Sequence, residues 1–226
     1  MAYIGSKPAD KVLTASDITD GIVSNAKLAQ DIISADTALG AEPADTDEFL
    51  VSDAGTLKRM DYSHIKGGIT HIDQWRLNTD FDGGADITSN LERLGLAGAG
   101  LLGSAMTESS GIFTFPATGY WLITFNVSIK ANDDGANNHA GGFIKTTTDN
   151  GSTWLEAAGG YNSIIDAGAN NSFSNCHFRH IFDVTDVSND NCKFNVSMQQ
   201  AGSTVQSGAG SDCTYTGFTF LRLGDT

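Results

Sequence analysis

Two histidines and a cysteine lie close together in the sequence, at Cys176, His177 and His180. Thiolate and imidazole groups are zinc ligands, so this group is a candidate metal site. The surrounding residues alternate between apolar and polar, which predicts a strand, and residues three apart in a strand point to opposite faces. We therefore expect His180 in the core, His177 outward and no metal within one chain. A three-fold site that takes His177 or His139 from each subunit is the open alternative.

A second polar segment offers hard oxygen ligands, since residues 132–138 read Asn-Asp-Asp-Gly-Ala-Asn-Asn. It lacks the ligand spacing of a dedicated calcium loop and a downstream bidentate glutamate. We expect a solvated loop and no cofactor, with calcium as the alternative. Loops rich in small amide groups suit contact with glycans or variable surface proteins. The candidates for receptor contact are Asn132, Asp133, Asp134, Asn137, Asn138, Asn170 and Asn171.

Residues 147–154 read Thr-Thr-Asp-Asn-Gly-Ser-Thr-Trp, which resembles the Asp-box of sialidase propellers. The pattern occurs once, and in those propellers it is a structural hairpin that carries no catalytic group. Asn150 and Gly151 favour a two-residue hairpin turn between strands over 143–148 and 153–155. We therefore expect a turn here and no chemistry.

Other catalytic patterns are absent from the sequence. Glycoside cleavage needs two carboxylates about 5–10 Å apart, and Glu92, Glu108 and Glu156 lie in different segments. The sequence has no Gly-x-Ser-x-Gly elbow, phosphate-binding loop or zinc-protease helix. We expect a protein that is not an enzyme, with a sugar-cleaving depolymerase as a remote alternative.

Composition restricts the partners of the 226-residue chain. Acidic residues outnumber basic ones 27 to 13, and the net charge of -14 repels phosphate backbones and anionic lipid headgroups. No apolar stretch approaches the ~18–20 residues of a membrane span, and the first residues lack the apolar segment of a secretory signal. We expect neither nucleic-acid binding nor membrane insertion.

Cysteine and glycine usage adds two expectations. Cys176, Cys192 and Cys213 cannot all pair within one chain and lack metal-type or redox-type spacing. We expect all three to be reduced, in half-buried strand positions. Twenty-six glycines with only three prolines favour many turns and an all-β fold.

Aromatic residues divide the chain near residue 70. The first 70 residues hold only Tyr3, Phe49 and Tyr62, which predicts an extended arm over 1–70 and a head domain over 71–226. Within the arm, an N-cap at 24–25 predicts a short helix over 26–33. Residues 49–52 and 56–60 predict a hairpin around Gly55, and paired glycines at 67–68 predict a hinge.

Apolar and polar residues alternate in the head. Within 120–130 one parity holds Trp121, Ile123, Phe125, Val127 and Ile129, and the other holds Thr124, Asn126, Ser128 and Lys130. Similar patterns occupy 176–184 and 192–198. The run 215–223 is apolar on both faces, which predicts cover from a neighbouring subunit. Short strands joined by Asn- and Gly-rich turns predict an antiparallel sandwich or jelly roll. The residues expected in its core or trimer interface are Trp121, Phe125, Tyr215, Phe218 and Phe220.

Residues 110–123 read Ser-Gly-Ile-Phe-Thr-Phe-Pro-Ala-Thr-Gly-Tyr-Trp-Leu-Ile. This segment resembles the Gly-x-Phe-x-x-Pro-x-x-Gly-x-Tyr-type signature of the complement component one-q and tumour-necrosis-factor-like jelly roll. Trp121 departs from the small or aliphatic residue often found there, and no collagen-like stalk is present. Segments 75–77, 106–111 and 218–226 look like tail-fibre heads of marine bacteriophages. Segments 2–5 and 13–23 are similar to the virion-attachment arms of those fibres.

The resemblance implies a homotrimer of jelly rolls in a phage virion, assembled in the host cytoplasm. Its arm would dock on other virion proteins, and its head would bind a host cell-surface glycan or protein as a tail fibre. The alternative is a capsid decoration or head-fibre protein with the same trimeric head. The arm residues expected to dock are Tyr3, Ile4, Leu13, Ile18, Ile22, Val23 and Leu28.

Overall fold

The computed structural model describes residues 14–17, 38–65, 67–95, 98–132, 137–165, 171–208 and 213–226. The chain divides into two compact units, Met1–Gly67 and Gly68–Thr226, which we call the N-terminal unit and the head. No helix in the described ranges is long and apolar enough to cross a membrane.

The N-terminal unit contains the predicted hairpin. Strands β1 (Glu48–Asp53) and β2 (Thr56–Asp61) pair in antiparallel register, with Asp53 opposite Thr56. The two turn residues, Ala54 and Gly55, have φ angles of 49° and 87°, as a type I′ hairpin requires. The hairpin prediction is therefore confirmed. Two 3-10 helices, η1 (Ala15–Asp17) and η3 (Tyr62–His64), are also described, whereas the helix expected over 26–33 lies outside the described residues.

In the described residues, the head has twelve antiparallel strands in two sheets. They are β3 (Ile72–Leu77), β4 (Phe81–Asp82), β5 (Leu91–Arg93), β6 (Thr107–Ser109), β7 (Ile112–Thr114), β8 (Gly119–Ala131), β9 (Asn137–Thr147), β10 (Leu155–Ile164), β11 (Ser172–Val184), β12 (Asn191–Met198), β13 (Thr204–Val205) and β14 (Gly217–Gly224).

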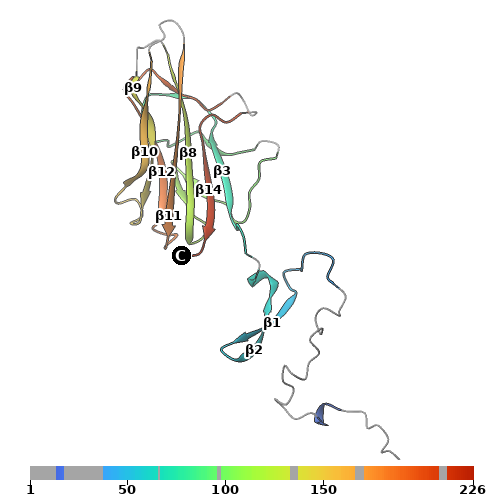
Figure 1. The fold of residues 1–226 in the computed structure, drawn as a ribbon. Helices are drawn as coiled ribbons and strands as arrows, with labels where there is room; N and C mark the ends of the chain where they lie inside the picture. Colours follow the sequence, from blue (N-terminus) through green and yellow to red (C-terminus); the bar gives the residue numbers. More distant parts are fainter. Residues whose placement is uncertain are drawn as a thin grey trace, which may run out of the picture. The chain divides into compact units, whose positions relative to one another are not determined.

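Strand order identifies the fold. One sheet has the order β10-β9-β12-β7-β6. In the other, β11, β8, β14, β3 and β5 are neighbours, and β13 and β4 continue beside the second half of β8. The chain crosses from one sheet to the other between β7 and β8 and again between β11 and β12. Within one sheet β8, β14 and β3 lie side by side (Figure 1). This arrangement is an antiparallel jelly roll, so the predicted fold class is confirmed.

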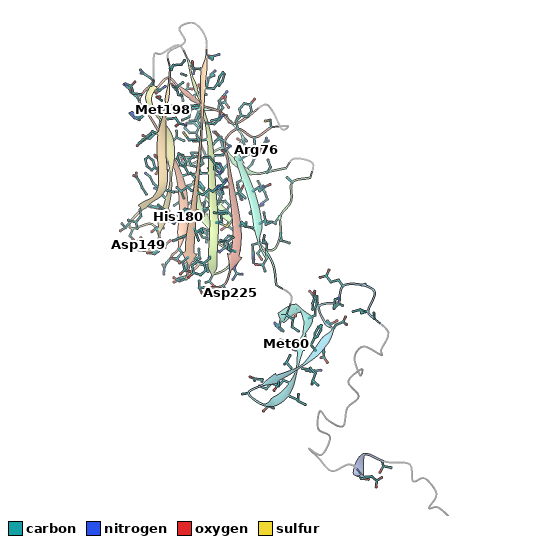
Figure 2. All side chains as sticks on the ribbon, in the orientation of Figure 1. Met60, Arg76, Asp149, His180, Met198 and Asp225 are labelled. Atoms are coloured by element: carbon teal, nitrogen blue, oxygen red, sulfur yellow. The ribbon has the colours of Figure 1, made fainter. Side chains whose placement is uncertain are left out.

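Strand register also defines the two ends of the head. Ile72 pairs with Leu221, which pairs with Leu122, and the head begins at this end, which we call the basal end. Ala131 pairs with Ser172 at the opposite, distal end. Figure 2 shows Asp149 and Asp225 toward the basal end and Met198 toward the distal end.

The core between the sheets is largely aromatic. Rings from both sheets meet there, with centroids 4.2 Å apart for Phe194 and Phe218 and 5.3 Å apart for Phe125 and Phe218. All five inward residues of β8 are buried, as the alternation predicts: Trp121, Ile123, Phe125, Val127 and Ile129.

The residues expected in the core or the trimer interface differ in their burial. Trp121, Phe125, Phe218 and Phe220 are buried inside the head of one chain. Tyr215 instead precedes β14, and 39% of its surface is exposed.

One carboxylate is buried at the edge of this core. Asp73 lies on the inward face of β3 and accepts hydrogen bonds from Arg93 Nε at 2.9 Å and Arg93 Nη2 at 3.1 Å. It also accepts from the Trp75 ring at 3.0 Å and from the Met106 backbone N–H at 2.9 Å. The carboxylate therefore ties β3 to β5 and to the segment before β6.

Replacing Asp73 with asparagine should destabilise the head. The Asp73→Asn variant keeps the size of the side chain but removes the charge that Arg93 pairs with, which should lower the free energy of unfolding by about 2–3 kcal/mol. Urea denaturation measures the loss. The exposed carboxylate of Asp225, paired with Arg222, is the control, and Asp225→Asn should cost under about 0.5 kcal/mol. Equal losses in the two variants would contradict this role for Asp73.

Candidate functional site

Two of the asparagines expected to contact a receptor serve the fold instead. The Asn137 side chain is fully buried, donating to Ser203 Oγ at 2.7 Å and accepting from the Gln200 backbone N–H at 2.8 Å. Asn132 Nδ2 donates to the Gly202 carbonyl at 2.9 Å. Both side chains hold the loop between β12 and β13, so the receptor-contact prediction is wrong for Asn137.

The remaining predicted contact residues have different outcomes. Asn138 and Asn171 are exposed at the distal end. Asp133, Asp134 and Asn170 lie outside the described residues, and so do all the predicted docking residues of the arm: Tyr3, Ile4, Leu13, Ile18, Ile22, Val23 and Leu28.

The two histidines of β11 lie on opposite faces of the strand, as the alternation predicts. His177 is exposed, with its ring 3.1 Å from the Asn126 side-chain oxygen, and it accepts from Arg179 Nε at 3.0 Å. His180 faces the other way and is half-buried, and burial lowers its pKa. Among the described residues, no group of three or more His, Cys, Asp or Glu side chains could hold a metal ion.

A hollow lies beside the edge strands β10 and β11, near the basal end. Its volume is about 710 Å³, and it brings together Asp149, Glu156 and His180 with Phe182 and several threonines. Two carboxylates beside a histidine in one hollow is an arrangement that the sequence did not predict.

The Asp149 carboxylate forms its hydrogen bonds within the adjacent loop. It accepts from Thr147 Oγ1 at 2.6 Å and from the Thr153 backbone N–H at 2.8 Å. The hydrogen bond from Thr147, followed by that from Thr153, holds the pKa of Asp149 below its usual value. A glycosidase acid needs a raised pKa, so the direction of this shift is opposite to that role.

The same hydrogen bonds explain the Asp-box-like segment. Asn150 and Gly151 lie in a turn with φ angles of 54° and 84°. The predicted two-residue hairpin is wrong, because residues 148–154 separate the two strands and Leu155 pairs with Thr146. The strands end earlier than predicted, because β9 stops at Thr147 and β10 begins at Leu155. The intervening loop is closed by the Thr147 and Asp149 side chains, which replace the backbone pairing.

The outward face of the seven-stranded sheet carries an apolar row at its basal end. Ile181, Leu122, Leu221 and Ile72 are successive cross-strand neighbours on β11, β8, β14 and β3. Ile181 is 57% exposed, and Leu122, Leu221 and Ile72 are half-buried. A continuous, partly exposed apolar row is a candidate interaction surface. We call these four residues the apolar row.

The outward face of the five-stranded sheet carries an aromatic cluster formed by His139, Phe143 and Tyr161. The Tyr161 ring centroid lies 5.2 Å from His139 and 5.4 Å from Phe143, with edge-to-face geometry at both contacts. Half of the Tyr161 surface is exposed. Exposed rings of this kind are typical of binding surfaces.

Sequence reasoning missed both surfaces. The apolar row joins four segments that are distant in the sequence, so only the strand register reveals it. The aromatic cluster had a local signal, because Gly-Gly precedes both Phe143 and Tyr161.

The prediction for the cysteines is only partly confirmed. Cys176 on β11 and Cys192 on β12 are buried, and burial raises the pKa of both thiols. Cys213 lies outside the strands and is exposed, so the half-buried strand position expected for it is wrong. Its strand-like sequence context precedes the start of β14 at Gly217.

Comparison with known proteins adds a structural likeness. No protein-family model matches the sequence, and no curated protein matches it. The head is similar to a solved structure titled "The Crystal structure of murine APRIL, pH 8.5", with a TM-score of 0.42 and 11% sequence identity. The match covers 68% of this chain and 98% of the murine chain. The fold assignment rests on the strand topology described above.

Thiol accessibility provides a direct check of the head structure. In the native protein, one thiol should react rapidly with an aromatic disulfide reagent, because Cys213 is exposed while Cys176 and Cys192 are buried. All three should react after denaturation. Cys213→Ser should abolish the rapid phase, and rapid reaction of two or more thiols in the folded chain would contradict the burial of β11 and β12.

Proposed function

We propose that the chain is a bacteriophage virion protein, a trimeric tail fibre that docks through residues 1–70 and binds the host cell surface through its head. The observation that carries this proposal is the distribution of exposed groups on the head. An apolar row lies at the basal end of one sheet, while Asn138, Asn171 and the aromatic cluster are exposed elsewhere in the described residues. The first surface suits self-association, and the second suits recognition.

Self-association accounts for the apolar row. Four aliphatic side chains on adjacent strands remain in contact with water in a single chain. Covering them with a second and third copy removes apolar surface from water, at roughly 25 cal/mol per Å². A closed ring of three copies would cover the row of every subunit.

Recognition in this proposal requires no catalysis. The Asp149 carboxylate beside the edge hollow is held by Thr147 and Thr153, and its lowered pKa favours the ionised form. Weak contacts repeated over three heads and many fibres hold a particle through avidity.

Disrupting the apolar row should separate the subunits. Ile181→Asp places a charge at the β11 end of the apolar row, and the exposed position tolerates it within one chain. We expect a trimer for the wild type and a monomer for the variant in sedimentation velocity at micromolar concentration, with unchanged circular dichroism. Ile112→Asp is the matched control, because Ile112 is an exposed isoleucine of the other sheet and its variant should stay trimeric. A monomeric wild type, or identical behaviour of the two variants, would contradict the proposed interface.

The receptor-binding role is tested by competition. Purified full-length chain, added to host cells before the phage, should reduce adsorption of the phage in proportion to the cell surface occupied. Because the chain has a net charge of -14, binding to a negative envelope should strengthen as ionic strength rises from about 10 to 150 mM. Adsorption that is unaffected by saturating chain would refute the role.

A further inference from the structure

The aromatic cluster lies on a part of the five-stranded sheet where glycines face the rings. Tyr161 pairs with Gly141, and Phe143 pairs with Gly159, so each ring faces a glycine across the β9–β10 ladder. A Cβ at Gly159 would come within 2.2 Å of Phe143 Cδ1, which places the Phe143 ring directly on the glycine backbone. The two glycines therefore bring the rings down onto the sheet.

Tyr161 is the central ring of the cluster. His139 and Phe143 lie on either side of Gly141 along β9, and the Tyr161 ring makes contact with both. Its ring therefore leans across Gly141, where no side chain competes for the space. Held on two sides, the ring pays little further rotamer entropy when a ligand stacks on it.

Polar groups adjoin the rings on the other side of β9. Ser197 of β12 pairs with Gly141, and Asn195 pairs with Phe143. Asn195 Nδ2 donates to Asp86 Oδ1 at 2.8 Å, whereas the Ser197 and Tyr161 hydroxyls have no hydrogen-bond partner within the part of the chain that the structure describes. A stacking ring bordered by free hydroxyl groups matches a ligand with one apolar face and a polar edge.

Charges near the cluster balance one another. Lys193 Nζ lies 2.8 Å from Asp86 Oδ2, and Lys145 Nζ lies 3.5 Å from Asp86 Oδ1 and 3.8 Å from Glu156. Both lysines are thus already paired, and the chain as a whole is acidic. This surface attracts neither an anionic sugar nor a nucleic acid. The outward residues of β9, β10 and β12 around the rings also include no aliphatic side chain, unlike the core of a protein–protein interface.

We infer that the Tyr161 ring, with Phe143, His139 and Ser197, is the subsite that binds a neutral pyranose of the host glycan. The C–H face of the sugar stacks on Tyr161, and its hydroxyl groups bond to Ser197 and to the Tyr161 hydroxyl. This inference rests on the proposed function, because it assigns the receptor class and the contact site. The site lies on the sheet opposite the apolar row, so association through that row leaves it accessible.

Immobilised oligosaccharides test the site directly. Full-length chain should be retained by neutral hexose and N-acetylhexosamine oligosaccharides and not by sialylated or sulfated ones. Tyr161→Ala should weaken retention by about tenfold, and Tyr161→Phe, which keeps the ring, by less than about threefold. Tyr215→Ala is the matched control, an exposed tyrosine outside the cluster that should leave retention unchanged.

A second variant distinguishes loss of the binding site from loss of folding. Ser197→Leu leaves all the rings in place but puts a branched side chain beside Gly141, so it should block stacking in a head whose circular dichroism is unchanged. Retention of anionic oligosaccharides alone, or equal retention by wild type, Tyr161→Ala and Ser197→Leu, would overturn the inference.

Periodate treatment of host cells separates the two proposals. Loss of chain binding after oxidation of surface glycans supports the glycan site. Equal binding to treated and untreated cells overturns the glycan site and leaves the attachment role standing. Absence of binding to untreated cells overturns the attachment role itself.

Discussion

The packing of phenylalanine rings between two sheets is the constraint on which the head depends. Phe194 from one sheet and Phe218 from the other have centroids 4.2 Å apart, and Phe125 stacks on Phe218. Because side chains alternate along a strand, burying one parity exposes the other. Burial of Phe125 on β8 thus places Leu122 outward, and burial of Phe194 on β12 places Ser197 outward. The core thereby determines which residues form both exposed surfaces.

Local patterns were sufficient to predict the strands. The alternation over 120–130, the glycine-marked turn at Gly55 and the short strands joined by Asn- and Gly-rich turns predicted β8, the hairpin and an antiparallel jelly roll, and the structure confirms each of them. These signals depend on side-chain period and backbone preference, which the sequence states residue by residue. Loop composition was a poorer guide, because Asn137 is buried by bonds to a loop more than sixty residues away.

Contacts between distant segments could not be predicted. The apolar row joins Ile72, Leu122, Ile181 and Leu221 only through the register of four strands. Asp73 is likewise buried beside Arg93 and Met106, which follow it by 20 and 33 residues. The two outward faces therefore have different chemistry, aliphatic at the basal end of one sheet and aromatic with hydroxyl groups on the other. In the proposed function, the first of these surfaces serves association and the second serves ligand binding.

We propose that these heads stand at the tail of a phage particle. Electron microscopy with gold-labelled antibodies against residues 71–226, applied to intact particles, tests this position. We expect label confined to the tail. Label spread over the capsid, or its absence from particles, would contradict attachment through a tail fibre, and capsid label would identify the trimer as a decoration of the shell.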